Sequence, residues 1–240
     1  MNNLLNKTIG EIVAEDYRTA EIFGKHGIDF CCKGNRSIQE ACSKANIDQA
    51  KLTEEVEAIL NKSEDASYDY QSWPLDQLAD HIEQKHHHYV EEKMPILKQY
   101  LEKLCQVHGK SHPELFEITR LFTASAGELA MHMKKEEFIL FPFVRKMERA
   151  KKSGEKITYA QFDTVQSPVR MMMEEHETEG DRFQLISELS NHYSLPDDAC
   201  NTYRVTFAML KEFEEDLHLH IHLENNILFP KSIALEKQLS

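Results

Sequence analysis

Two copies of one short segment carry side chains of the kinds that bind metal ions. The copies span residues 132–142 and 220–230, and both follow the pattern H-x3-E-x2-I-L-F-P. A histidine and a glutamate four residues apart lie one turn apart on the same face of a helix. Each copy therefore predicts a helix that presents one imidazole and one carboxylate to a single site. The two pairs are His132 with Glu136 and His220 with Glu224.

These polar pairs interrupt apolar stripes instead of lying on a polar helix face. Leu129 precedes the first pair at helical spacing, and Ile139 and Met147 follow it. The second pair lies in the same way between Leu217 and Leu228. A carboxylate buried without a partner costs on the order of several kcal/mol, and a cation held between the helices would remove that cost. The stripes therefore predict a metal site in the protein core.

Two more histidines are expected to complete this site. His176 lies on an apolar stripe of its own. Farther upstream, His86, His87 and His88 are consecutive, so they cannot all face the core. His86 fits the apolar series before it and His87 fits the series after it, so periodicity alone does not choose between them. The two repeat copies are offset by 88 residues, and an offset of 88 or 89 places the counterpart of His176 at 88 or 87; similar His-to-His spacings favour His87.

Four histidines and two glutamates suit two metal ions better than one. In this arrangement both carboxylates bridge the ions and each ion takes two imidazoles, which leaves positions open for an oxo or hydroxo bridge and a small ligand. Structural zinc sites usually close four ligands, often thiolates, around a single ion. Iron is therefore the preferred metal, with manganese second. The predicted ligands are His87, His132, Glu136, His176, His220 and Glu224.

Other reactive side chains lie outside this set. Glu128 is four residues before His132, and Glu175 directly precedes His176, so either carboxylate is a candidate base or proton carrier beside the ligands. The adjacent Cys31 and Cys32 lie in a glycine-flanked loop, which favours accessible thiols able to bind iron, nitric oxide or a partner's cluster.

Three histidines have no predicted ligand role, because they fall off the apolar stripes. They are His81, His218 and His222.

Helical periodicity runs through almost the whole chain, without a convincing strand pattern, and predicts an all-α fold. Residues 1–65 are expected to form a small helical domain, with helices at Ile9–Phe23, Ser37–Lys44 and Asp48–Leu60. Residues 62–73 lose the periodicity and read as a linker. Residues 74–240 predict an antiparallel, up-down four-helix bundle. Its long helices are expected at about 75–107, 113–149, 160–191 and 197–234.

The composition restricts the partners and the compartment. A net charge of −13 repels nucleic acid and anionic membranes, so neither is an expected partner. No apolar run approaches the ~18 residues of a spanning helix, and the first residues lack the plan of a signal peptide. Five cysteines form no secreted disulfide framework, which predicts reduced thiols and a cytoplasmic protein.

Together these residues carry a family resemblance. The bundle resembles a hemerythrin-like domain, on its repeat copies, His87 and the segment 173–177 (MEEHE). The whole chain resembles the RIC (repair of iron centres, ScdA-like) family, whose small N-terminal domain is matched by the stretch 27–34 (GIDFCCKG). The resemblance implies a bundle around a non-haem di-iron centre, with Glu136 and Glu224 as bridges and His87 chosen over His86. The fifth histidine of oxygen-carrying hemerythrins has no counterpart here, which argues against reversible oxygen transport.

The family further implies a cytoplasmic, homodimeric stress protein that helps to restore iron–sulfur clusters damaged by nitric oxide or peroxide. Its partners would be the damaged iron–sulfur proteins, and nitric oxide or oxygen would be the small ligand. Two other functions compete with repair. One is a sensor of nitric oxide or oxygen, although no output domain is visible. The other is a di-iron nitric oxide or peroxide reductase, which steady turnover with an electron donor would distinguish from stoichiometric iron transfer.

Overall fold

The computed structural model describes residues 4–61, 69–157 and 163–239. Every regular element in these ranges is a helix, and an isolated bridge between Thr8 and Ser37 is the only β pairing found there. The predicted all-α fold is therefore confirmed. Most of the predicted linker, residues 62–68, lies outside the described residues, as does the expected helix start at 160–162.

Four short helices make up the N-terminal part. They are α1 (Ile9–Glu15), α2 (Thr19–Lys25), α3 (Ile38–Ala45) and α4 (Gln49–Leu60). Capping boxes begin α1 and α3, and the Asp48 side chain caps α4 by accepting from the N–H groups of Ala50 and Lys51.

The single helix expected at Ile9–Phe23 is wrong, because two helices occupy that range. Asp16 ends α1 in an extended conformation. Its backbone carbonyl accepts from the hydroxyl of Thr19, at 2.7 Å, and from the Thr19 N–H, at 3.0 Å. These bonds satisfy the backbone at the corner, where apolar periodicity alone suggested continuity.

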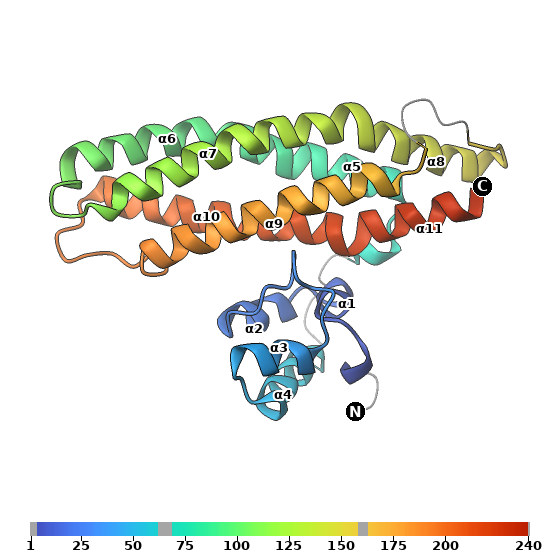
Figure 1. Ribbon diagram of the computed structural model, residues 1–240, viewed down its shortest axis with the longest axis horizontal. Helices are drawn as coiled ribbons and strands as arrows, with labels where there is room; N and C mark the ends of the chain where they lie inside the picture. Colours follow the sequence, from blue (N-terminus) through green and yellow to red (C-terminus); the bar gives the residue numbers. More distant parts are fainter. Residues whose placement is uncertain (1–3, 62–68, 158–162, 240) are drawn as a thin grey trace.

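Four long, nearly continuous helical rods form the bundle, as predicted, and Figure 1 shows them lying side by side along the long axis of the molecule. Three of the rods contain one π-helical turn each. The first rod is α5 (Leu75–His81), the π turn Ile82–His87 and α6 (His88–His108). The second is α7 (Glu114–Lys135), the π turn Glu136–Leu140 and α8 (Phe141–Ser153). The third is α9 (Gln166–Leu189). The fourth is α10 (Asn201–Leu223), the π turn Glu224–Leu228 and α11 (Phe229–Leu239).

Each π turn shifts the helical register, because its wider turn accommodates an extra residue. In the second rod, Ile139 was expected in the core but is 40% exposed, and Leu140 is buried in its place. In the first rod, Leu78 is buried before the turn, Ile82 and His87 are buried at its two ends, and Val90 is buried after it. The stripe therefore changes phase inside the turn, which is why both His86 and His87 matched a stripe.

The polar residues of the predicted site lie between two apolar clusters of the bundle. One cluster joins α6, α7, α9 and α10 and includes Phe122 and Phe213. The other joins α5, α8, α11 and the start of α9, and it includes Phe141 and Phe229. A polar layer enclosed on both sides in this way is shielded from water, so its polar atoms need partners inside the protein.

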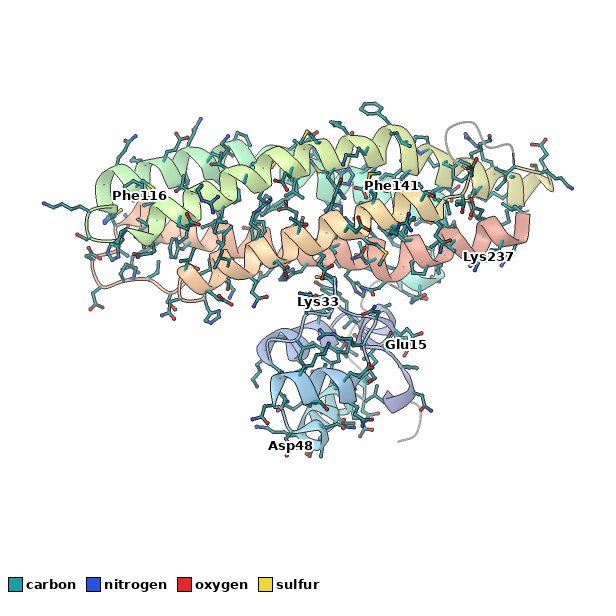
Figure 2. All side chains as sticks on the ribbon, in the orientation of Figure 1. Glu15, Lys33, Asp48, Phe116, Phe141 and Lys237 are labelled. Atoms are coloured by element: carbon teal, nitrogen blue, oxygen red, sulfur yellow. The ribbon has the colours of Figure 1, made fainter. Side chains whose placement is uncertain are left out.

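The N-terminal part contacts one long side of the bundle, and its loop at residues 30–34 reaches α9 and the π turn Glu224–Leu228 (Figure 1). Lys33, labelled at this contact in Figure 2, bonds Asp181 of α9 at 2.9 Å. Within the described ranges, no helix combines the length and apolarity needed to cross a membrane.

Candidate metal centre

The structure brings the six predicted ligand side chains together, and none of them is more than 3% exposed. They form two groups in which all candidate ligand atoms lie within 4.8 Å of one another. The first group contains His87 and His220, and the second contains His132 and His176. Both groups include Glu136 and Glu224, so the two carboxylates are shared.

Short distances join each imidazole to a carboxylate. Glu136 Oε2 lies 3.3 Å from the Nε2 atoms of both His87 and His132. Glu224 Oε2 lies 3.3 Å from His176 Nε2, and its Oε1 lies 3.2 Å from His220 Nε2. Each carboxylate therefore contacts one imidazole of each group, the arrangement that a bridging ligand requires.

Whether a cation fits can be judged from the hydrogen bonding of the carboxylate oxygens and the four Nε2 atoms, most of which have no hydrogen-bond partner. All four carboxylate oxygens, together with the Nε2 atoms of His87 and His220, are buried without a hydrogen bond in the described structure. Such orphaned polar atoms are costly in a water-free core. Two divalent cations would satisfy them, and imidazole and carboxylate form a normal ligand set for iron or manganese. The residues present therefore fit a metal pair.

The charges of the cluster depend strongly on one another. Burial opposes the charged form of His132, but the nearby Glu136 carboxylate prevails and raises the His132 pKa to about 10. The same balance raises the pKa of His87. Burial would raise the pKa of Glu224, yet His220 and His176 hold it well below its usual range. Without a cation, protons on His87 and His132 thus offset carboxylate charge, whereas burial lowers the pKa of His220; a metal ion would replace those protons.

The internal repeat explains the packing around the candidate ligands as well as the presence of His132, Glu136, His220 and Glu224. The phenylalanine near the end of each copy stacks on the histidine that the preceding rod contributes. Phe141 lies 5.5 Å from His87 between ring centroids, and Phe229 lies 5.9 Å from His176 with its plane tilted by only 4°. These rings pack against the imidazoles on the side of the second apolar cluster and restrict their orientation.

Three of the four imidazoles form a hydrogen bond through Nδ1, the ring nitrogen on the side away from the shared carboxylates. His132 Nδ1 lies 2.7 Å from Glu175 Oε2, so Glu175 is beside the cluster, where it was predicted. His87 Nδ1 lies 3.0 Å from Glu137 Oε1, and His176 Nδ1 lies 2.9 Å from Asn225 Oδ1. Partners of this kind fix the tautomer and orientation of a ligating ring.

Sequence reasoning missed Glu137 and Asn225. A signal for them exists, because each directly follows the glutamate of one repeat copy.

The structure does not bring Glu128 to the cluster. Its side chain is half exposed and pairs with Arg182 of α9 at 2.8 Å. The helix therefore turns Glu128 toward solvent, although it lies only one turn before His132.

Several histidines without a predicted role are nevertheless buried. His86 is fully buried, with Nδ1 3.0 Å from Asp216 Oδ1, and its ring stacks on His220. His222 is 1% exposed because Tyr17 and Phe30 of the N-terminal part cover it. The apolar stripes of the bundle could not reveal this second contact face of α10.

Cys31 and Cys32 face the bundle. Asp29 Oδ1 accepts from both backbone N–H groups and shapes the loop. Cys32 Sγ lies 3.2 Å from the backbone oxygen of His176, and a Cβ atom on Gly180 would come within 3.1 Å of that sulfur. The expectation of two accessible thiols is wrong for Cys31, which is 4% exposed, and the hydrogen bond to Cys32 and burial raise its pKa well above the usual range.

Comparisons with known proteins agree with this architecture. Residues 5–60 match ScdA_N, a domain of unknown function (DUF542), and residues 78–232 match the hemerythrin HHE cation binding domain. Relatives called iron-sulfur cluster repair protein YtfE, from Yersinia pestis and Yersinia pseudotuberculosis, are 32% identical over 231 residues. The match covers 96% of this chain and 98% of each relative. The chain therefore belongs to the RIC (repair of iron centres) family, with a hemerythrin-like cation-binding bundle behind an ScdA-like N-terminal domain.

Proposed function

We propose that this protein holds two non-haem iron ions and takes part in the repair of iron–sulfur clusters damaged by nitrosative or oxidative stress. The observation that carries the proposal is the pair of ligand groups that share Glu136 and Glu224 in a buried layer. The relatives named as iron–sulfur cluster repair proteins cover the chain almost end to end, which supports the same role here.

The ligand set favours iron over a structural zinc ion. No thiolate belongs to either bundle group, and each ion would receive only two imidazoles in addition to the shared carboxylates. Such a set leaves room for a small ligand such as nitric oxide or oxygen. When bound, iron would supply redox chemistry and a reserve of metal for a damaged cluster.

The chain's own residues contribute burial and orientation. The two apolar clusters exclude water, Phe141 and Phe229 restrict the imidazoles, and Glu137, Glu175 and Asn225 hold their outer nitrogens. We further propose that Cys31 and Cys32 handle iron or nitric oxide, since their loop touches the backbone of the ligand His176.

Damaged iron–sulfur proteins are the proposed partners, in the cytoplasm. The family resemblance is the ground for proposing a homodimer, which light scattering on the purified protein tests.

Metal analysis and Mössbauer spectroscopy on protein purified without oxygen test the centre. The proposal expects about two irons per chain in a coupled pair. Stoichiometric zinc without iron would overturn it. For the repair role, the iron-loaded protein is added to an enzyme whose cluster was damaged with nitric oxide, and recovery of that enzyme is measured. Recovery proportional to the iron supplied indicates transfer, whereas steady consumption of nitric oxide with an electron donor would indicate a reductase.

A further inference from the structure

One imidazole of the metal centre, that of His220, lacks the outer hydrogen bond that the other three form. In each of those three, Nδ1 lies within 3.0 Å of an oxygen of Glu137, Glu175 or Asn225. His220 Nδ1 is buried and has no hydrogen-bond partner within the described part of the chain. A ring that binds a cation through Nε2 keeps its proton on Nδ1, so the buried N–H of His220 needs an acceptor.

The internal repeat identifies the residue that stands at the place of the missing acceptor. His220 corresponds in the repeat to His132, whose acceptor is Glu175. In chain order, Glu175 directly precedes the third candidate ligand histidine, and His86 directly precedes the first. An imidazole therefore stands where the other half of the centre has a carboxylate.

His86 is itself bonded to a carboxylate. Its Nδ1 lies 3.0 Å from Asp216 Oδ1, and an ionised carboxylate only accepts, so His86 Nδ1 is the donor. The other nitrogen, Nε2, is then left as an acceptor, and it is buried without a partner in the described structure. The His86 and His220 rings are parallel within 9°, with 5.6 Å between their centroids. A buried donor and a buried acceptor thus lie on neighbouring rings that share no hydrogen bond.

One water molecule between these rings would satisfy both atoms. A water oxygen lies about 3 Å from each of its partners, so it can join nitrogens up to about 6 Å apart. It can accept from His220 Nδ1 and donate to His86 Nε2, and internal waters typically make about three hydrogen bonds. Two further atoms next to His86, Asp216 Oδ2 and His81 Nε2, are also buried without a partner in the described ranges. Either of them can form the third bond.

A cation fits this place less well than a water molecule. Within the described residues, none of His81, His86 and Asp216 belongs to a group of three ligand atoms that lie within 4.8 Å of one another. Water, which both donates and accepts, matches the mixture of an N–H donor and acceptor atoms found here.

Aromatic side chains separate this group from solvent. The His81 ring lies 5.7 Å from the His86 ring and packs against Tyr70 and Trp73, with centroid distances of 5.5 Å and 5.2 Å. His86 and His220 are each no more than 1% exposed. Leaving their polar atoms unpaired in such surroundings is costly, and one internal water removes that cost.

We propose that the bundle holds one internal water molecule between His86 and His220. Through this water, the Asp216–His86 pair orients the His220 imidazole, as Glu175 alone does for the corresponding ring. The inference rests on the proposed metal centre, because His220 needs an outer acceptor once its Nε2 binds a cation. His86 and Asp216 are positioning residues, since they act on the ion only through His220. Loss of such an outer partner typically lowers metal affinity about 10–100-fold.

A crystal structure of the full chain loaded with iron tests the water itself. We expect an ordered oxygen atom within about 3.2 Å of both His86 Nε2 and His220 Nδ1. A direct bond between the two rings, or no ordered atom between them, would overturn the proposal.

Equilibrium dialysis of the full chain against ferrous iron, without oxygen, tests the positioning. His86→Phe keeps an aromatic ring but removes both nitrogens, and Asp216→Leu independently removes the carboxylate from a side chain that is 16% exposed. Each variant should bind one iron about 10–100-fold more weakly and the other iron as the unmodified protein does. Unchanged binding of both irons, or an equal loss of the two, would contradict the inference.

Two more variants separate positioning from a structural effect. Asp216→Asn keeps an oxygen that accepts from His86 Nδ1, so it should retain most of the affinity that Asp216→Leu loses. His222→Phe is the matched control, because His222 is another buried histidine of α10 and belongs to neither ligand group. It should bind both irons normally. Equal losses in Asp216→Asn and Asp216→Leu, or loss of an iron from His222→Phe, would refute the positioning role.

Mössbauer spectra of the diferrous protein supply a readout that a loss of stability does not produce. His86→Phe should shift the quadrupole doublet of one iron and leave the other doublet unchanged, whereas His222→Phe should shift neither. If the unmodified chain binds no iron pair, the proposed centre and this inference fail together. A normal iron pair in the unmodified chain, with identical doublets in His86→Phe, would refute the inference alone.

Discussion

The shared position of Glu136 makes a sharp prediction about metal content. Glu136 belongs to both ligand groups, whereas His132 belongs to one. Glu136→Ala therefore removes a ligand from both ions at once, and His132→Ala removes a ligand from only one ion. We expect about two irons per chain in the unmodified protein, about one in His132→Ala and fewer than about 0.5 in Glu136→Ala, because structural metal binding depends on a complete ligand set.

The thermal stability should follow the metal content. A ligand present at about a thousandfold excess over its dissociation constant stabilises the native state by about 4 kcal/mol. For a chain of this size, 1 kcal/mol corresponds to about 2–4 °C in Tm. Each ion should therefore raise Tm by roughly 8–16 °C under those conditions. Ferrous iron should raise the Tm of His132→Ala by about half as much as that of the unmodified protein, and leave the Tm of Glu136→Ala almost unchanged.

The assay combines anaerobic iron quantification with thermal unfolding followed by circular dichroism. Glu148→Ala is a matched control, because Glu148 is also a buried carboxylate of the second rod but lies in neither ligand group. It should retain both irons. If Glu136→Ala instead kept one iron, as His132→Ala is expected to do, Glu136 would not be a bridge and the reasoning from the shared carboxylates would be refuted.

Three further predictions follow from the same structure. His222→Ala should keep its iron but lose about 1–3 kcal/mol of stability, because His222 packs under Tyr17 and Phe30; metal analysis and urea unfolding test this, and iron loss matching that of His220→Ala would contradict it. In the metal-free protein, the raised pKa of His132 stabilises the fold fully below its ordinary value of 6.5, and this stabilisation is lost as the pH rises through about 10, so Tm should fall over that interval. Over the same interval the affinity for iron should rise about tenfold per pH unit for each proton displaced. Titration calorimetry in buffers of different ionisation enthalpy measures the protons released on iron binding, and no release would contradict the prediction. A fragment of residues 74–240 should hold two irons yet restore less of a nitric-oxide-treated cluster enzyme, with Cys31→Ser/Cys32→Ser in the full chain behaving alike; undiminished repair by the fragment would exclude a role for the cysteine pair.

The candidate ligands could be recognised because their signal is local and occurs twice. A histidine and a glutamate four residues apart share a helix face whatever surrounds the helix, and the second copy of the motif makes an accidental match improbable. Apolar neighbours at the same spacing then indicate that this face is buried. The structure places the six predicted side chains in one layer, with Glu136 and Glu224 common to both groups.

Local sequence pattern could not predict which residues face the core on the two sides of a π turn. Periodicity assumes 3.6 residues per turn, and a π turn adds a residue without changing the composition of the stripe. That is why Ile139 was expected inside the core although Leu140 is there, and why His86 and His87 both matched a stripe. Each of the three π turns includes a candidate ligand: His87, Glu136 or Glu224.

What the sequence by itself determined was the all-helical class, the bundle and the residues able to bind metal. Only the tertiary structure decided which atoms hold those residues in place. Asn225 bonds the carbonyl oxygen of Cys31, 194 residues away in the chain, and the contact between the N-terminal part and the bundle buries His222 and Cys31. Periodicity indicates only the face that a helix buries inside its own bundle. These contacts of Asn225 and His222 are made instead with the N-terminal part, which packs against the outside of the bundle. Contacts between rods were likewise invisible to periodicity: Glu137, Glu175 and Asn225 bond the outer nitrogens of His87, His132 and His176, and these bonds became visible only once the rods were placed together.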